Sequence, residues 1–95
     1  MPIKYFIETY DTHTEITRES FTVTHFYSNK NAYDLEFQYN FEGKPRITAV
    51  PFYVYNTVNV GDTVVCDVER FYKNKTEKYT KSVFHFVELK KKNMT

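Results

Sequence analysis

The strictest constraint on this sequence is an unbroken alternation of apolar and polar residues from position 33 to position 41. The apolar positions are Tyr33, Leu35, Phe37, Tyr39 and Phe41, and the polar positions between them are Asp34, Glu36, Gln38 and Asn40. Successive side chains of a strand point to opposite faces, so this period of two places all the large groups on one face. The stretch therefore predicts a half-buried β-strand.

A hairpin is predicted directly after this strand. Glu42-Gly43-Lys44 would form the turn, because glycine supplies the positive φ that a short loop needs. Pro45 can open the return strand, which is predicted over residues 46–55, without having to donate a hydrogen bond to the sheet. Pro51 lies within that strand, which indicates an edge position or a bulge where the sheet bends.

Four other stretches have the composition and alternation of β-strands. They are residues 3–10, 15–27, 63–71 and 79–89, and the predicted connections between strands include residues 11–14 and 72–78. A helix capped at Thr14 is an alternative for the second stretch, but its many threonines favour a strand. Three polar residues of the stretch from position 63 are expected to face solvent: Asp67, Glu69 and Arg70.

These elements predict an all-β fold, a small antiparallel barrel or strongly curled sheet of five or six strands. Closure or curling would remove the unpaired edges of an open sheet. The two candidates are an SH3-like and an OB-like barrel. An OB-fold commonly carries a helix between its third and fourth strands, and residues 56–62 are too few for one, which favours an SH3-like or simplified OB-like form. Residues 1–89 are predicted to be one domain and residues 90–95 a charged, flexible tail.

One resemblance rests on the two glycine-containing turns. The succession Phe41-Glu42-Gly43-Lys44, a strand, and Val60-Gly61-Asp62-Thr63-Val64 resembles a pattern in a family of small bacterial β-domains of unknown function, several of which are appended to membrane segments. The resemblance covers roughly residues 34–68. No activity, partner or site residue is carried over from it.

Charge and cysteine content bound the possible functions. The formal net charge is +1, from 13 Lys and Arg against 12 Asp and Glu, so the chain lacks the global positive field of a nucleic-acid coat protein. Cys66 is the only cysteine, which excludes an intrachain disulfide and indicates a reducing compartment. No secretory signal and no long apolar span is visible, so we expect a soluble, cytoplasmic protein that does not bind a membrane.

The sequence shows no catalytic constellation, and we expect no enzyme, no cofactor and no metal site. The three histidines, His13, His25 and His85, lack the ligand spacings of a metal centre. Cys66 and His85 could meet on adjacent strands, but a thiol among valines is more typical of an inert, packed residue.

The favoured function is a binding module for another protein, with a homodimer through the last strand as its simplest form. The nine tyrosines and nine phenylalanines exceed what one small core can hold, and exposed aromatic rings are enriched at interface hot spots. The predicted contact residues are Tyr53, Tyr55, Phe84 and Phe86.

Binding of single-stranded nucleic acid is the alternative. Aromatic and basic residues interleave in the last third of the chain, where bases could stack on rings while lysines follow the phosphates. The residues of this predicted site are Arg70, Phe71, Tyr72, Lys73, Lys75, Lys78, Tyr79 and Lys81. The same lysines could simply keep an exposed hairpin from pairing with other strands.

Overall fold

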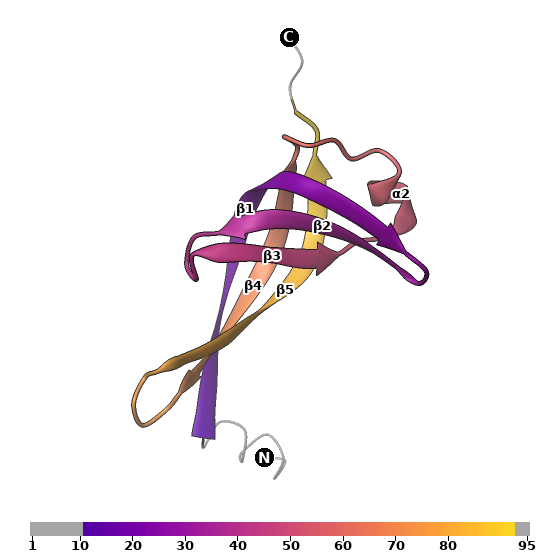
Figure 1. Cartoon of the computed structure of the whole chain (residues 1–95). Coiled ribbons are helices and arrows are strands. Elements are labelled where there is room, and N and C mark those ends of the chain that lie inside the picture. Colours follow the sequence, from indigo (N-terminus) through magenta and orange to yellow (C-terminus); the bar gives the residue numbers. More distant parts are fainter. Residues whose placement is uncertain (1–10, 93–95) are drawn as a thin grey trace.

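A single long strand, β1, organises the fold. The computed structural model describes residues 11–92, which form one five-stranded antiparallel sheet and one short helix (Figure 1). The elements are β1 (Thr12–Asn29), β2 (Ala32–Tyr39), β3 (Lys44–Ala49), α2 (Phe52–Tyr55), β4 (Thr63–Lys73) and β5 (Tyr79–Lys90). The predicted all-β class is confirmed, while the strand predicted over residues 3–10 lies outside the described residues.

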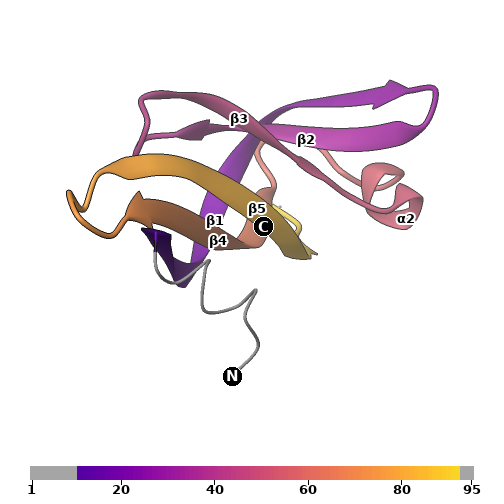
Figure 2. The ribbon, with the colours of Figure 1, turned by 90° about the horizontal axis from the view of Figure 1, so that it is seen from below.

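The strand order is β3-β2-β1-β4-β5, and β1 belongs to both halves of the sheet. Its first half, from Thr12 to Thr22, pairs with β4, and its second half, from Val23 to Asn29, pairs with β2. The register shifts between Val23 and His25, a bulge of the kind that bends a strand. Figure 2 shows the result, with β2 and β3 lying over the layer of β1, β4 and β5.

The core lies between these two layers and is built by the alternation that the sequence predicts. Leu35, Phe37 and Tyr39 of β2 are fully buried and meet Val64 and Val68 of β4. Burying a side chain of this size contributes roughly 1.5–3 kcal/mol to the free energy of unfolding. The period-two pattern of residues 33–41 thus fixes which face of β2 is inside, although Phe41 itself lies beyond the end of the strand.

The predicted turn between β2 and β3 is present but lies slightly earlier in the chain, at residues 40–43, and Lys44 is already the first residue of β3. Gly43 has a φ of 72°, and its N–H donates to the carbonyl oxygen of Tyr39 at 2.9 Å. Pro45 lies near the start of β3, an edge strand, where its missing N–H removes no hydrogen bond from the middle of the sheet.

The second half of the predicted strand 46–55 is wrong, because the chain leaves the sheet after Ala49 and forms α2. Pro51 precedes the helix, and its carbonyl oxygen accepts the N–H groups of Val54 and Tyr55. Val50, Val54 and Val58 are all buried, and their spacing of four is that of one face of a helix. This spacing was the available signal for a helix between β3 and β4.

Two predicted connections are also wrong at their ends. Thr12 already starts β1, and Tyr72 and Lys73 still belong to β4. β1 starts earlier and β4 ends later than predicted because these two strand ends pair with each other, Thr12 with Lys73 and His13 with Tyr72. The ribbon of β1, β4 and β5 therefore extends beyond β2 and β3 (Figure 1).

Asp62 holds the end of β5 against the loop that precedes β4. Its carboxylate is 1% exposed and accepts the N–H of Asn59 (2.8 Å), the N–H of Lys92 (2.8 Å) and the ammonium of Lys91 (2.6 Å). Burial by itself would raise the pKa of Asp62, but these donors lower it below the ordinary value. Of the predicted tail, residues 90–95, Lys90 is thus the last residue of β5, and Lys91 and Lys92 are hydrogen-bonded to Asp62.

Candidate binding surfaces

An aromatic cap covers the end of the sheet where α2 meets the β1–β2 hairpin (Figure 1). We define the cap as Phe26, Tyr33, Phe52, Tyr53 and Tyr55. Three ring contacts join four of these residues: Phe26 to Tyr55 (5.7 Å between centroids), Tyr55 to Tyr33 (5.0 Å) and Tyr33 to Phe52 (5.3 Å). These four rings therefore form one continuous aromatic surface supplied by β1, β2 and α2, and Tyr53 follows Phe52 in α2.

The cap projects into solvent. Tyr53 is 71% exposed, Phe52 55% and Phe26 38%. Val54, between the two exposed residues of α2, is buried in the core and anchors the helix. Exposed large rings on an anchored helix form a rigid apolar surface without charge of its own, which is the kind of surface found at protein interfaces.

The structure separates the predicted contact residues into two pairs. Tyr53 and Tyr55 lie together in α2 as members of the cap. Phe84 and Phe86 lie in β5, are half-buried and pack against the core, where the Phe84 ring lies 5.1 Å from that of Phe37. Phe26 was absent from the predicted set, and its contact with Tyr55 follows from the pairing of β1 with β2.

The opposite end of the sheet is the β4–β5 hairpin, which also carries a row of rings. Phe41 lies 4.8 Å from Tyr79, Tyr79 lies 5.8 Å from Tyr72, and Tyr72 stacks on His13 at 5.4 Å. Tyr72 shares the inner face of β4 with core residues such as Val68, because both lie at even positions of a regular strand. The row therefore continues the core toward the hairpin tip.

The predicted nucleic-acid site is divided between the two faces of this hairpin. Arg70, Tyr72 and Tyr79 lie on the inner face, whereas Phe71 and Lys81 pair on the outer face, with the ammonium 4.9 Å from the ring centroid. The other predicted residues, Lys73, Lys75 and Lys78, are exposed near the tip.

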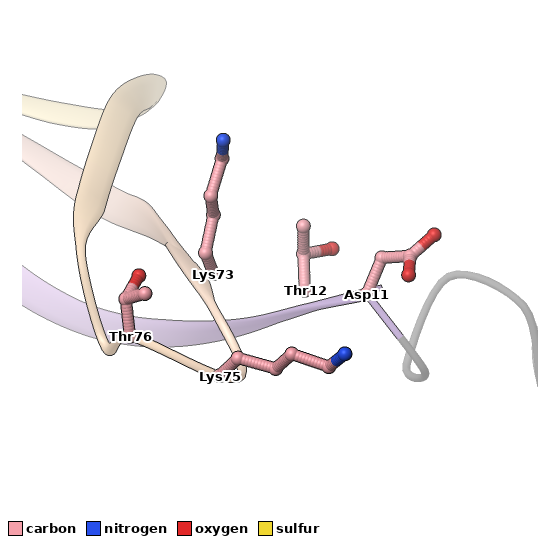
Figure 3. A pocket seen from close by; sticks show the side chains of 5 residues that line it. All are labelled: Asp11, Thr12, Lys73, Lys75 and Thr76. Carbon is pink, nitrogen blue, oxygen red and sulfur yellow. The ribbon is translucent and has the colours of Figure 1, made fainter.

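Two of these lysines line a pocket of about 410 Å³ beside the start of β1 (Figure 3). Its described lining residues are Asp11, Thr12, Lys73, Lys75 and Thr76. Figure 3 shows Lys73 and Lys75 leaving the hairpin in different directions, with Thr12 at the start of the neighbouring strand β1 and Asp11 just before it. Two ammonium groups near hydroxyls suit an anionic group, and the carboxylate of Asp11 reduces that preference.

Arg70 does not face solvent as predicted, since its side chain is only 11% exposed. It forms an ion pair with Glu19 (2.7 Å), donates to the hydroxyl of Tyr39 (2.8 Å) and lies 4.3 Å from the ring centroid of Phe41. These partners come from three separate segments, so a sequence pattern within β4 could not reveal them. The prediction that Asp67 and Glu69 lie on the opposite face from the core is correct.

A hydrogen-bonded cluster, which we name the Tyr39 network, surrounds Arg70. Its members are Glu19, Tyr39, Glu42, Arg46, Arg70, Tyr79 and Ser82. The Tyr39 hydroxyl bonds Ser82 at 2.8 Å, and Tyr79 donates to Glu42. Arg46 donates to Glu42 (2.7 Å) and to the carbonyl of Ser82 (3.0 Å), which joins β3 to β5 where the sheet curls toward closure.

Two pKa shifts follow from this cluster. Burial and the hydrogen bond to Glu42 raise the pKa of Tyr79 to about 12. Burial would raise the pKa of Glu42, but the hydrogen bonds from Tyr79 and Arg46 lower it below the ordinary value. Both shifts stabilise the form in which a neutral phenol donates to an ionised carboxylate.

The residues considered for catalysis lie apart. Cys66 faces the core, where burial raises the pKa of its thiol to about 11. His85 faces outward on β5 and contacts Glu69 at 3.2 Å. Cys66 and His85 thus lie on opposite faces of the sheet, and within residues 11–92 no cluster of three metal-ligating side chains is found.

Comparisons with protein-family models, curated proteins and solved structures found no match to this chain. In the part of the chain that the structure describes, no helix is long and apolar enough to cross a membrane.

Proposed function

We propose that this chain is a non-enzymatic binding module that recognises an apolar segment of a partner protein through the aromatic cap. The observation that carries the proposal is the continuity of the cap, in which ring contacts join Phe52 to Phe26 while both rings stay open to solvent. Aromatic rings concentrate binding energy at interfaces, where truncating one hot-spot residue costs about 2 kcal/mol or more.

Packing within the cap supports tight binding. Tyr33 and Tyr55 are half-buried and hold their neighbours by ring contacts, so little side-chain freedom is lost when a partner binds. The burial of Val54 fixes the position of α2 against the sheet. A partner segment with aliphatic or aromatic side chains would complement this surface.

The test is selection of peptides from a displayed random library against the whole chain, followed by fluorescence-anisotropy titration of the selected peptides. The proposal expects apolar peptides whose affinity falls at least tenfold for the double variant Phe52→Ser, Tyr53→Ser. Ile47→Ser is the matched control, because Ile47 is 50% exposed but lies on β3 outside the cap. Equal affinity for the double variant and the wild type would contradict the proposal.

We also propose that the barrel is OB-like rather than SH3-like. Supporting this are the long β1 shared by two half-sheets, the helix between β3 and β4, and the contact of β3 with β5 through Arg46. OB-folds bind oligonucleotides with the face of their second and third strands and with the loops after the first and fourth strands. The lone, reduced Cys66 supports a cytoplasmic location for such a module.

Single-stranded nucleic acid is a second candidate ligand, favoured by one observation. The loop between β4 and β5, a ligand-binding loop of OB-folds, carries Lys75 and Lys78, and Lys73 lies at the end of β4 beside the exposed part of Tyr72. On the outer face of β2, however, the carboxylate of Glu36 accepts a hydrogen bond from the Tyr27 hydroxyl and lies 3.3 Å from His25. A negative charge therefore occupies the face that oligonucleotides use in OB-folds, which disfavours binding of phosphates there. The protein-binding proposal therefore ranks first.

Anisotropy of a labelled single-stranded oligonucleotide, measured at several salt concentrations, tests the second candidate. Loss of one phosphate contact in Lys75→Gln would reduce the slope of log affinity against log salt by about 0.7. Lys90→Gln, at the far end of β5, should leave the slope unchanged. Absence of binding at low salt would remove nucleic acid as a ligand.

A further inference from the structure

The first half of β1 has a partner strand on one side. Residues from His13 to Glu19 pair with β4, and β2 joins β1 only from Val23 onward. All five residues from Thr14 to Arg18 are exposed, so the stretch is open to solvent on both faces of the strand. Within residues 11–92 no other strand pairs with the second side of this stretch. Among the residues that the structure describes, it is therefore an open sheet edge (Figure 1).

The chemistry of this edge permits pairing. Alternate residues of an edge strand direct their N–H and C=O groups outward, ready to bond another strand. Proline and lysine, which discourage such pairing, do not occur between His13 and Glu19. The one cation, Arg18, donates both nitrogens to Asp67 on β4, at 2.9 and 3.1 Å, which holds it over the sheet. Ile16 is 63% exposed on the outer face.

The sequence of the edge is complementary to itself in one antiparallel register. In an antiparallel pair, side chains that lie opposite each other are on the same face of the sheet. Residues on the outer face of one copy must therefore lie opposite residues on the outer face of the other copy. This requires the two-fold axis to pass through a residue position and not between two residues. An axis at Ile16 places Ile16 beside its own copy, Thr14 opposite Arg18, Glu15 opposite Thr17, and His13 opposite Glu19. The neighbouring registers, centred on Glu15 or Thr17, would place glutamates opposite each other, which is destabilising.

We propose that two copies of this chain form a symmetric dimer by antiparallel pairing of their β1 edges, centred on Ile16. The ribbon of β1, β4 and β5 then continues through the axis into the same ribbon of the second copy. The aromatic cap lies at the opposite end of β1, so the dimer leaves it open, and this inference does not depend on the proposed function.

The first experiment measures mass by light scattering after size exclusion. The wild-type chain should elute with twice its mass of 11.5 kDa. Ile16→Lys places two ammonium groups at the axis and should shift the dissociation constant at least tenfold toward monomer. Ile47→Lys, an equally polar change on the outer side of β3, should leave the dimer intact. A monomer at 100 µM wild-type protein, or a dimer that resists Ile16→Lys, would overturn the inference.

Cysteine cross-linking tests the register. Two Ile16→Cys copies would meet at the axis at a separation that a disulfide can span, whereas two Thr14→Cys copies would lie roughly four strand residues, or about 14 Å, apart. Cys66 is buried and should not compete. We expect oxidation to give a covalent dimer only with Ile16→Cys; cross-linking of both variants alike would overturn the register. In a monomer, slow exchange of the amides in residues 13–19 that point away from β4 would show that the chain covers its own edge, and it would also overturn the dimer.

Discussion

The aromatic cap and the Tyr39 network lie at opposite ends of the sheet and use the same residue types differently. In the cap, ring contacts join four of the five residues, and the two most exposed members are Tyr53 and Phe52. In the network, the hydroxyls of Tyr39 and Tyr79 are bonded to Ser82, Glu42 and Arg70. One end stabilises the fold through polar bonds, whereas the other leaves large apolar side chains exposed.

Under the proposed function, this difference separates the residues that stabilise the fold from those that bind a partner. Removing a polar partner from the network leaves another buried polar group without its bond, which costs far more than the bond itself contributes. Removing an exposed ring from the cap creates no such orphan. Substitutions at the two ends should therefore affect different measurements.

The largest expected effect is that of Arg70→Met. The change keeps most of the side-chain volume but leaves Glu19 without its cation and removes the hydrogen bond from Arg70 to Tyr39, and we expect a loss of about 3 kcal/mol in the free energy of unfolding. Urea denaturation measures it. Arg18→Met is the control, because it breaks a similar Arg–carboxylate pair whose arginine is 63% exposed, and it should cost much less. Equal losses would show that Arg70 has no special structural role.

Alkaline pH should weaken the network next. The pKa of Tyr79 is about 12 in the folded chain, against an ordinary 10.0. The folded state therefore holds this proton more tightly, so its stabilisation is complete below pH 10 and is lost as the pH rises from 10 toward 12. Denaturation of wild type and Tyr79→Phe at pH 9 and pH 11 measures the effect. The wild type should lose more stability than the variant; identical losses would contradict the assignment.

A matched pair of hydroxyl deletions sharpens the comparison further. Tyr79→Phe removes a donor to Glu42 and should cost about 1 kcal/mol. Tyr55→Phe makes the same chemical change in the cap, where the ring contacts with Phe26 and Tyr33 remain, and should leave thermal stability nearly unchanged. A larger loss for Tyr55→Phe would mean that polar bonds also hold the cap.

The smallest expected effect on stability is that of Tyr53→Ser. With a ring that is 71% exposed, the variant should unfold within about 0.5 kcal/mol of the wild type. Its affinity for a cap-binding peptide should nevertheless fall several-fold. Chemical denaturation and peptide titration on the same sample check both expectations, and a destabilised variant with unchanged binding would reverse the roles assigned to the two ends.

The parts of the fold that follow from local periodicity could be predicted. The alternation around Phe37 determines the inner face of β2, and Gly43 determines the turn that follows. The helix α2 could not be recognised from composition, because Phe52 to Tyr55 consists of residues that favour strands. Pro51 and the four-residue spacing of Val50 and Val54 were the only local signs of it.

The candidate sites were harder to predict, because they depend on residues distant in sequence. The chain holds more aromatic residues than one small core can bury, and this excess predicts Tyr53 and Tyr55 as contact residues. The contact of Tyr55 with Phe26, however, requires the pairing of β1 with β2. Arg70 is predicted at the surface because it is charged, although strand alternation places it on the same face as Val68. Alternation cannot show that Glu19 and Tyr39 meet it there from other strands. Long-range pairing therefore decides which rings and charges remain exposed.

The shared strand β1 also determines the order in which the chain can fold on the ribosome. The second half of β1 finds β2 after a two-residue turn, so the β1–β2–β3 meander can form as soon as it emerges. The first half must wait for β4, since Thr12 pairs with Lys73. The earliest part of β1 to be synthesised is thus among the last to be paired, and until β4 emerges none of the strands that the structure describes covers either of its edges.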